Sequence, residues 1–115
     1  MFQFENLHLY KRAVVFSKEI YITTMDWPKS EIFGLINQIR RAAVSVVLNI
    51  AEGSSRTKKD FSHFLDLARG SLFECVAALE IALQCKYIIS SKYNSIYTEC
   101  DELSRMISGL KKSLL

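Results

Sequence analysis

Apolar residues recur along most of the chain at alternating spacings of three and four, which is the period of one face of an α-helix. Four segments carry this pattern, and none shows the strict alternation typical of a β-strand. We therefore expect four helices, over about 8–24, 29–52, 58–87 and 91–114. Because the three connections are short, the simplest fold is all-α: a single domain, residues 1–115, forming an up-down-up-down antiparallel four-helix bundle.

Turn and capping residues mark the ends of these predicted helices. Pro28 suits the start of the second helix, where its missing N–H costs nothing. Gly53 is expected to end that helix in the left-handed conformation. Thr57 is the expected N-cap of the third helix, and Ser90 or Ser91 that of the fourth.

The second predicted helix is apolar on two faces rather than one. The face expected to meet the core comprises Ile32, Leu35, Ile36, Ile39, Ala42, Ala43, Val46 and Ile50. The second face comprises Phe33, Val44, Val47, Leu48 and Ala51. A helix in a monomeric bundle has one such face, so another subunit, another segment or a ligand must cover the second. The pattern favours self-association, with four residues as expected subunit contacts: Phe33, Val44, Val47 and Leu48.

A polar strip runs between these two apolar faces. Its members follow spacings of three, four, four and three: Gln38, Arg41, Ser45, Asn49 and Glu52. We interpret the strip first as hydrogen-bonding partners inside the bundle or at a subunit contact, because polar groups in crowded surroundings need partners. Ligand recognition is the second interpretation.

Composition adds a mildly basic surface and no sign of a secreted or membrane protein. Half of the 115 residues are hydrophobic and the net charge is +3, which permits a polyanionic partner. Cys75, Cys85 and Cys100 are odd in number and lack a C-x-x-C spacing, so we expect reduced, packed thiols. No cleavable signal or uncharged stretch of about 20 residues is present, which predicts a cytoplasmic protein without membrane contact.

A di-metal site is the first catalytic possibility in a helical bundle, but the histidines are poorly placed for it. The nearest ligand pairs are Glu5 with His8 and Asp60 with His63. Both pairs lie at helix starts, and His63 falls opposite the apolar seam of its helix, so inward ligation is geometrically poor. No nucleophile elbow, phosphate loop or nucleotide fingerprint occurs either. We expect no cofactor and no enzymatic activity.

Basic residues cluster in two places that could contact phosphate. The first is the loop before the third helix, with Arg56, Lys58 and Lys59; the second is Arg40 and Arg41 in the second helix. Two other interpretations stay open. The loop can be a solvated connection, and the two mid-helix arginines can pair with Glu52, Glu74 or a neighbouring subunit. No base-reading motif accompanies these charges, so any binding would be to phosphates rather than to sequence.

The chain resembles a known family over essentially its whole length. The residues that carry the resemblance are Gly34-Leu35, Gln38-Ile39-Arg40-Arg41-Ala42, Ser45, Asn49-Ile50-Ala51-Glu52-Gly53, Phe64-Leu65, Ala68-Arg69-Gly70-Ser71 and Glu74. They are similar to the bacterial four-helix-bundle proteins encoded in intervening sequences of 23S rRNA genes. The resemblance implies a cytoplasmic homopentamer. A nucleic-acid role is implied by the family's genetic setting and by its similarity to the accessory variability protein of diversity-generating retroelements.

These observations together predict a non-enzymatic homo-oligomer, a pentamer, that binds RNA or another nucleic acid through phosphate contacts. The loop cations Arg56, Lys58 and Lys59 are the first candidates for those contacts, and Arg40 and Arg41 the second. The alternative is a protein-interaction scaffold in which the oligomer itself is functional. A metal-binding bundle enzyme is the third interpretation.

Overall fold

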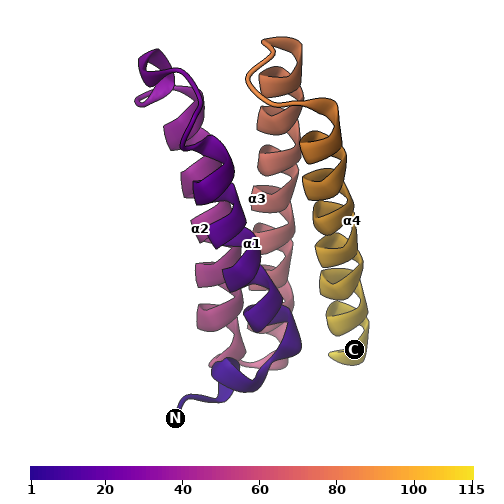
Figure 1. Cartoon of the computed structure of the whole chain (residues 1–115). Helices are drawn as coiled ribbons and strands as arrows, with labels where there is room; N and C mark the ends of the chain where they lie inside the picture. The colour runs from indigo at the N-terminus through magenta and orange to yellow at the C-terminus, as the bar shows by residue number, and fades with distance from the viewer.

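The computed structural model describes all 115 residues and contains four α-helices and no β-strand. The helices are α1 (His8–Thr24), α2 (Leu35–Ser54), α3 (Lys58–Gln84) and α4 (Ser90–Ser113). Two 3₁₀ turns accompany them: η1 (Gln3–Asn6) precedes α1, and η2 (Lys29–Glu31) lies between α1 and α2. The helices lie side by side along a backbone of 42 × 22 × 21 Å (Figure 1). The prediction of an all-helical chain is confirmed.

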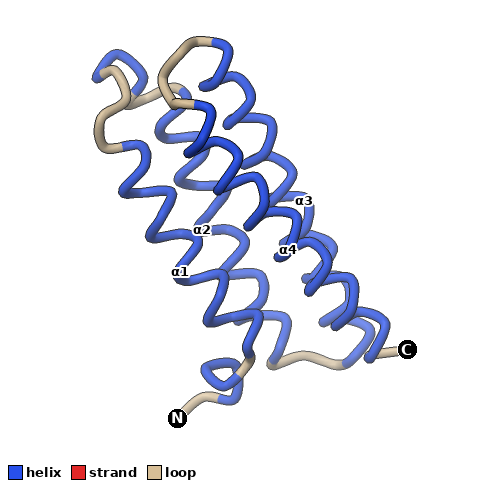
Figure 2. Tube along the Cα trace, turned by 45° about the vertical axis from the view of Figure 1, so that its right-hand side comes forward, coloured by secondary structure: helices blue, strands red, loops and turns tan.

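Each helix contacts two neighbours around one shared core. α2 contacts α1 and α3, and α4 contacts α3 and α1. The short connections lie at the two ends of the molecule, as the tube view shows (Figure 2). The connection between α2 and α3 lies at the same end as both chain termini (Figure 1).

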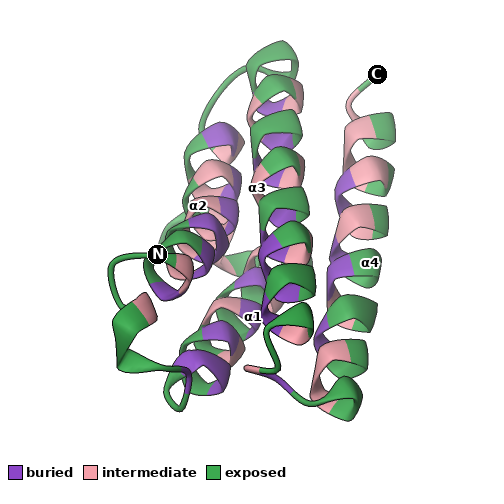
Figure 3. Ribbon diagram, turned by 90° about the horizontal axis from the view of Figure 1, so that it is seen from above, coloured by how far each residue is buried: buried purple, intermediate pink, exposed green.

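A single cluster of 24 buried apolar residues forms this core. Buried positions follow one side of each helix and face the neighbouring helices (Figure 3). Most belong to the predicted seams, including Leu9, Ala13, Phe16 and Ile20 of α1 and Phe61, Leu65, Ala68, Leu72, Cys75, Leu79 and Ala82 of α3. None of the helices combines the length and apolar character that crossing a bilayer demands.

The second helix begins later than the sequence pattern predicts, at Leu35 rather than near residue 29. Gly34 has φ −109° and ψ −114°, a conformation that separates the η2 turn from α2. Glu31 then reaches forward, and its Oε1 accepts a hydrogen bond from the Leu35 N–H at 3.1 Å. Ile32 was expected in the core, but it lies before the helix and is 48% exposed.

Gly53 serves packing rather than helix termination. It lies inside α2, which continues to Ser54, and no glycine in the chain has a positive φ. A Cβ at Gly53 would lie 2.6 Å from the Phe64 Cβ and 2.9 Å from Phe61 Cδ1. The residue is therefore small because α2 and α3 approach closely here, and the expected left-handed helix end is wrong.

One of the two predicted N-caps occurs. The Thr57 hydroxyl accepts a hydrogen bond from the Asp60 N–H at 3.2 Å, which confirms the predicted cap of α3. At the start of α4, Ile89 occupies the N-cap and supplies no side-chain hydrogen bond. Ser90 and Ser91 already lie within that helix, so the prediction that one of them caps it is wrong.

The third helix ends at Gln84 rather than near residue 87. Lys86 adopts φ 63°, in the left-handed region, and turns the chain back. The Tyr87 N–H consequently bonds the Ala82 carbonyl at 2.8 Å, and the Tyr87 hydroxyl donates to Glu31 Oε2 at 2.9 Å. This end of the molecule is thus closed by contacts between the two connections.

Candidate functional site

The second apolar face of α2 is divided between solvent and the rest of the chain. Phe33 lies on the connection before α2 and is 94% exposed, and Leu48 on α2 is 59% exposed. Val44 and Val47 are half-buried, and Val47 packs against the core. The N-terminal turn η1 contacts α2 near Leu48, where Phe2 helps to line a shallow hollow. Another segment therefore covers part of this face, and Phe33 and Leu48 remain open.

One member of the polar strip, Ser45, is hydrogen-bonded to the neighbouring helix α3. Asn49 Nδ2 donates to the Ser45 carbonyl at 2.9 Å and to Ser45 Oγ at 3.0 Å. Ser71 of α3 donates to the same Ser45 hydroxyl at 2.9 Å. Gln38 and Arg41 lie further along a polar groove that α3 completes with Ser71 and Glu74. Arg41 is exposed and forms no ion pair within the chain.

Arg40 is held by α1. Its Nε donates to Thr24 Oγ1 at 2.8 Å, and its Nη2 donates to the Tyr21 carbonyl at 3.3 Å. The guanidinium also lies over the Tyr21 ring, 4.8 Å from the centroid. Arg40 therefore donates a hydrogen bond to a backbone carbonyl in the last turn of α1, where a cation also complements the helix dipole. It pairs with neither Glu52 nor Glu74, and its Nε and Nη2 both donate to α1.

The three loop cations differ in whether they have partners within the chain. Arg56 forms an ion pair with Glu52 at 2.9 Å, and its guanidinium lies 5.3 Å from the centroid of the Phe64 ring. Lys58 and Lys59, the first two residues of α3, are exposed and form no ion pair. The two lysines are therefore the freest of the three predicted phosphate contacts in this loop.

The titratable groups form no cluster that could hold a metal ion. His8 and His63 are both exposed, and no group of three or more His, Cys, Asp or Glu side chains lies close enough to hold a metal ion. The three cysteines are free thiols. Burial raises the pKa of Cys75 and raises the pKa of Cys100 to about 12, so both stay protonated at neutral pH. Cys85 is exposed, which corrects the expectation that it is packed.

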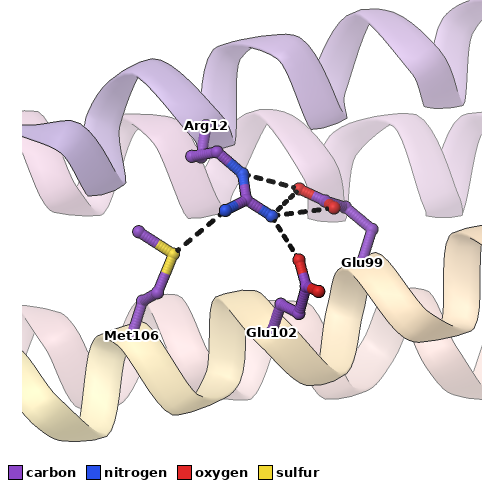
Figure 4. A network of polar contacts seen from close by, with 4 residues as sticks. All are labelled: Arg12, Glu99, Glu102 and Met106. Carbon is purple, nitrogen blue, oxygen red and sulfur yellow. Dashed lines mark hydrogen bonds and ion pairs between the residues drawn. The ribbon is translucent and has the colours of Figure 1, made fainter.

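An ion-pair network between α1 and α4 was not predicted from the sequence (Figure 4). Arg12 Nη2 donates to both carboxylate oxygens of Glu99, at 2.8 and 2.9 Å, and to Glu102 Oε2 at 2.6 Å. Its Nη1 lies 3.7 Å from Met106 Sδ. The hydrogen bonds that Arg12 donates to Glu102 and to Glu99 raise the pKa of its guanidinium above the ordinary value. The only sequence signal is the three-residue spacing of Glu99 and Glu102 on one face of α4. Because Arg12 lies on α1 and bonds both carboxylates, the network joins α1 to α4.

The comparisons with known proteins agree with this fold. The family model for the 23S rRNA-intervening sequence protein matches residues 5–109. A crystal structure of a protein of unknown function from the S23 ribosomal protein family of Bacteroides thetaiotaomicron superposes with a TM-score of 0.81 at 23% identity, covering 90% of this chain and 98% of that one. No curated protein matches the chain. Because the family model spans nearly the whole sequence, this chain belongs to the 23S rRNA-intervening sequence protein family.

Proposed function

We propose that this chain is a non-enzymatic, homo-oligomeric protein that binds RNA, or another nucleic acid, through its phosphates without reading sequence. In this proposal its four helices form an up-down-up-down bundle, and five copies assemble into a pentamer in the cytoplasm. The observation that carries the nucleic-acid role is the pair Lys58 and Lys59. These two consecutive residues begin α3, are exposed and form no ion pair within the chain.

The surrounding charges support the same assignment. Arg56 lies in the same loop, and Phe64 and Glu52 hold its guanidinium in place. Arg41 adds an exposed, unpaired cation on α2, whereas Arg40 is withdrawn from the proposed interface because α1 occupies it. The family's name refers to 23S rRNA, which favours RNA over DNA as the nucleic acid.

Self-association is supported by apolar side chains that the chain leaves open. Phe33, Leu48, Phe73 and Ile81 are all more than half exposed. Large apolar side chains of this kind are buried when another protein covers them. An assembly would also repeat the Lys58–Lys59 pair around its axis, and several weak phosphate contacts on one strand would then act together.

Salt dependence of RNA binding tests the nucleic-acid role. We expect the affinity for a single-stranded homopolymer to fall linearly with salt on logarithmic axes. A Lys58→Gln/Lys59→Gln variant should bind all homopolymers more weakly and with a shallower slope, by about 0.7 for each phosphate that is no longer neutralised. The matched control is Lys18→Gln/Lys29→Gln, which removes the same charge from two exposed, unpaired lysines elsewhere. Binding that is absent at low salt, or equal in the two variants, would reject the proposal.

Light scattering tests the assembly. The unmodified chain should have the mass of a pentamer, and Leu48→Glu should reduce that mass while the helix signal in circular dichroism is retained. Met25→Glu, a charge placed on an exposed apolar residue of the connection after α1, is the control and should leave the mass unchanged.

A protein-interaction scaffold is the second candidate function, because the same open apolar residues could serve it without any polyanion. The two candidates differ in one measurement. A pentamer that retains its mass but binds no RNA at low salt would favour the scaffold.

A further inference from the structure

A second group of cations lies between α3 and α4. The last turn of α4 lies at the same end of the molecule as the loop before α3 (Figures 1 and 2). The cations line a hollow to which α3 contributes Arg69 and the hydroxyl of Ser62. The last turns of α4 contribute Ser108, Lys111 and Lys112. Three basic residues and two serines from two helices thus line the hollow, together with Leu115.

Two of these cations are held in position by one carboxylate. Asp66 accepts from Arg69 Nη2 at 3.2 Å and also from Lys111 Nζ. Arg69 Nη1 in addition lies 3.4 Å from Ser108 Oγ. Lys112 is exposed and has no ion pair. An anion entering the hollow would therefore meet two cations whose positions are already restrained and a third that is free.

The hollow continues the surface that begins at the loop. Lys59, Ser62, Asp66 and Arg69 follow one another at spacings of three, four and three, so they lie on one face of α3. Arg69 lies ten positions after Lys59, which corresponds to roughly 15 Å of helix. This face of α3 and the hollow beside it carry more basic than acidic side chains. The acidic ones are Asp60 and Asp66, and the five basic ones are Lys58, Lys59, Arg69, Lys111 and Lys112.

We infer that this hollow binds a phosphate group of the nucleic acid, so that the strand runs from the loop along α3 into the space between α3 and α4. The inference rests on the proposed function and adds the path of the strand to it. Lysines in the last turn of α4 also complement the negative end of its dipole. That role explains Lys111 and Lys112, but it does not explain why Arg69 and Ser62 converge on them from α3.

The test compares variants that we expect to change RNA affinity in opposite directions, with an oligouridine RNA as the probe. Arg69→Gln/Lys112→Gln should weaken binding about fivefold to tenfold at low salt and make the salt slope shallower by about 0.7 for each phosphate left without its cation. Asp66→Asn should tighten binding severalfold, because it removes the carboxylate that competes with the phosphate. Lys18→Gln/Lys29→Gln is again the charge control. Lys112→Gln alone should weaken binding less than the double variant, and it disturbs no ion pair within the fold.

The outcomes separate this inference from the function on which it rests. If Lys58→Gln/Lys59→Gln weakens binding but the Arg69 and Lys112 variants do not, the hollow is not a phosphate site and the proposed function stands. Unchanged or weaker binding by folded Asp66→Asn would also overturn the inference. A wild-type chain that binds no oligouridine at low salt would overturn both.

Discussion

The contact between α2 and α3 is close and largely apolar, whereas long charged side chains span the contact between α1 and α4. α2 and α3 share the most extensive contact in the molecule. Gly53 allows their backbones to approach against Phe61 and Phe64, and the Ser45 and Ser71 hydroxyls bond further along. Close packing of this kind is sensitive to added volume but insensitive to salt.

The contact between α1 and α4 is the least extensive of those between neighbouring helices. Arg12 crosses it to Glu99 and Glu102, and Lys92 crosses it to Glu19. These side chains are about one-third to one-half exposed, so solvent screens the pairs and each contributes little to stability. We therefore expect α1 and α4 to separate before α2 and α3 do.

Adding volume to the α2–α3 contact should give the largest effect. Gly53→Val should lower the free energy of unfolding by about 1–3 kcal/mol, because the new Cβ meets the Phe64 Cβ rather than a flexible side-chain end. Urea denaturation measures the change. Gly70→Ala is the control: a Cβ there meets nothing within 4 Å, so the helix should gain up to about 1 kcal/mol. A stable Gly53→Val protein would show that α2 and α3 are not closely packed.

Removing the cation of the α1–α4 contact should have a smaller, salt-dependent effect. Arg12→Met should lower the free energy of unfolding by about 1 kcal/mol at low salt, and the difference from wild type should shrink in about 1 M NaCl, where charges are screened. Arg105→Met is the control, because Arg105 pairs only with Asp101 of its own helix and is 80% exposed. A salt-independent loss in Arg12→Met would mean that the packing of its aliphatic stem, rather than its charge, joins the helices.

Thiol labelling can show which contact opens first. In a Cys85→Ser background two buried thiols remain, Cys75 on α3 beside the Ile39 carbonyl of α2 and Cys100 on α4. Cys100 should be alkylated faster than Cys75, and added salt should increase the difference, because labelling requires local opening. Mass spectrometry of the two peptides measures both rates. Equal rates at every salt concentration would mean that the molecule opens as one unit.

The smallest expected effect concerns pH at the α3–α4 contact. The hydrogen bond from Lys111, with the charge of Arg69, holds the pKa of Asp66 below its usual range. A carboxyl whose pKa is lowered by folding stabilises the fold at pH values above its pKa in the unfolded chain, about 3.9. This contribution is lost as the pH falls through its pKa in the folded chain. Asp66→Asn should therefore cost about 0.5 kcal/mol at pH 7 and nothing near pH 2, measured by urea denaturation. A constant difference across this range would mean that the ion pair is not its source.

The four helices could be predicted from the sequence, because the residues that form the core recur at the three- and four-residue spacing of a helix face. The seams of α1 and α3 are buried as their spacing predicts, and Thr57 caps α3. The start of α2 was not readable, because the interruption depends on the backbone of Gly34 and on Glu31 reaching forward. The role of Gly53 could not be predicted, because a glycine near a helix end can either adopt a left-handed turn or allow a neighbouring helix to approach closely.

The candidate site was less predictable, because a sequence shows charges but not their partners. Arg40 and Lys58 are both basic residues, yet Arg40 is bonded to Thr24 of α1, sixteen residues away, whereas Lys58 is exposed and forms no ion pair. The cations of the α3–α4 hollow were not predicted, since Arg69 and Lys112 are 43 positions apart and meet only when the helices pack.

The late start of α2 determines the shape that any partner must have. Phe33 lies just before the helix and Leu48 is the fourteenth residue of it, so roughly 20 Å of helix lies between these two exposed residues. A small ligand or a contact made only at the tip would reach one of them. Covering both requires a rod-like neighbour that lies lengthwise beside α2, as another helix would.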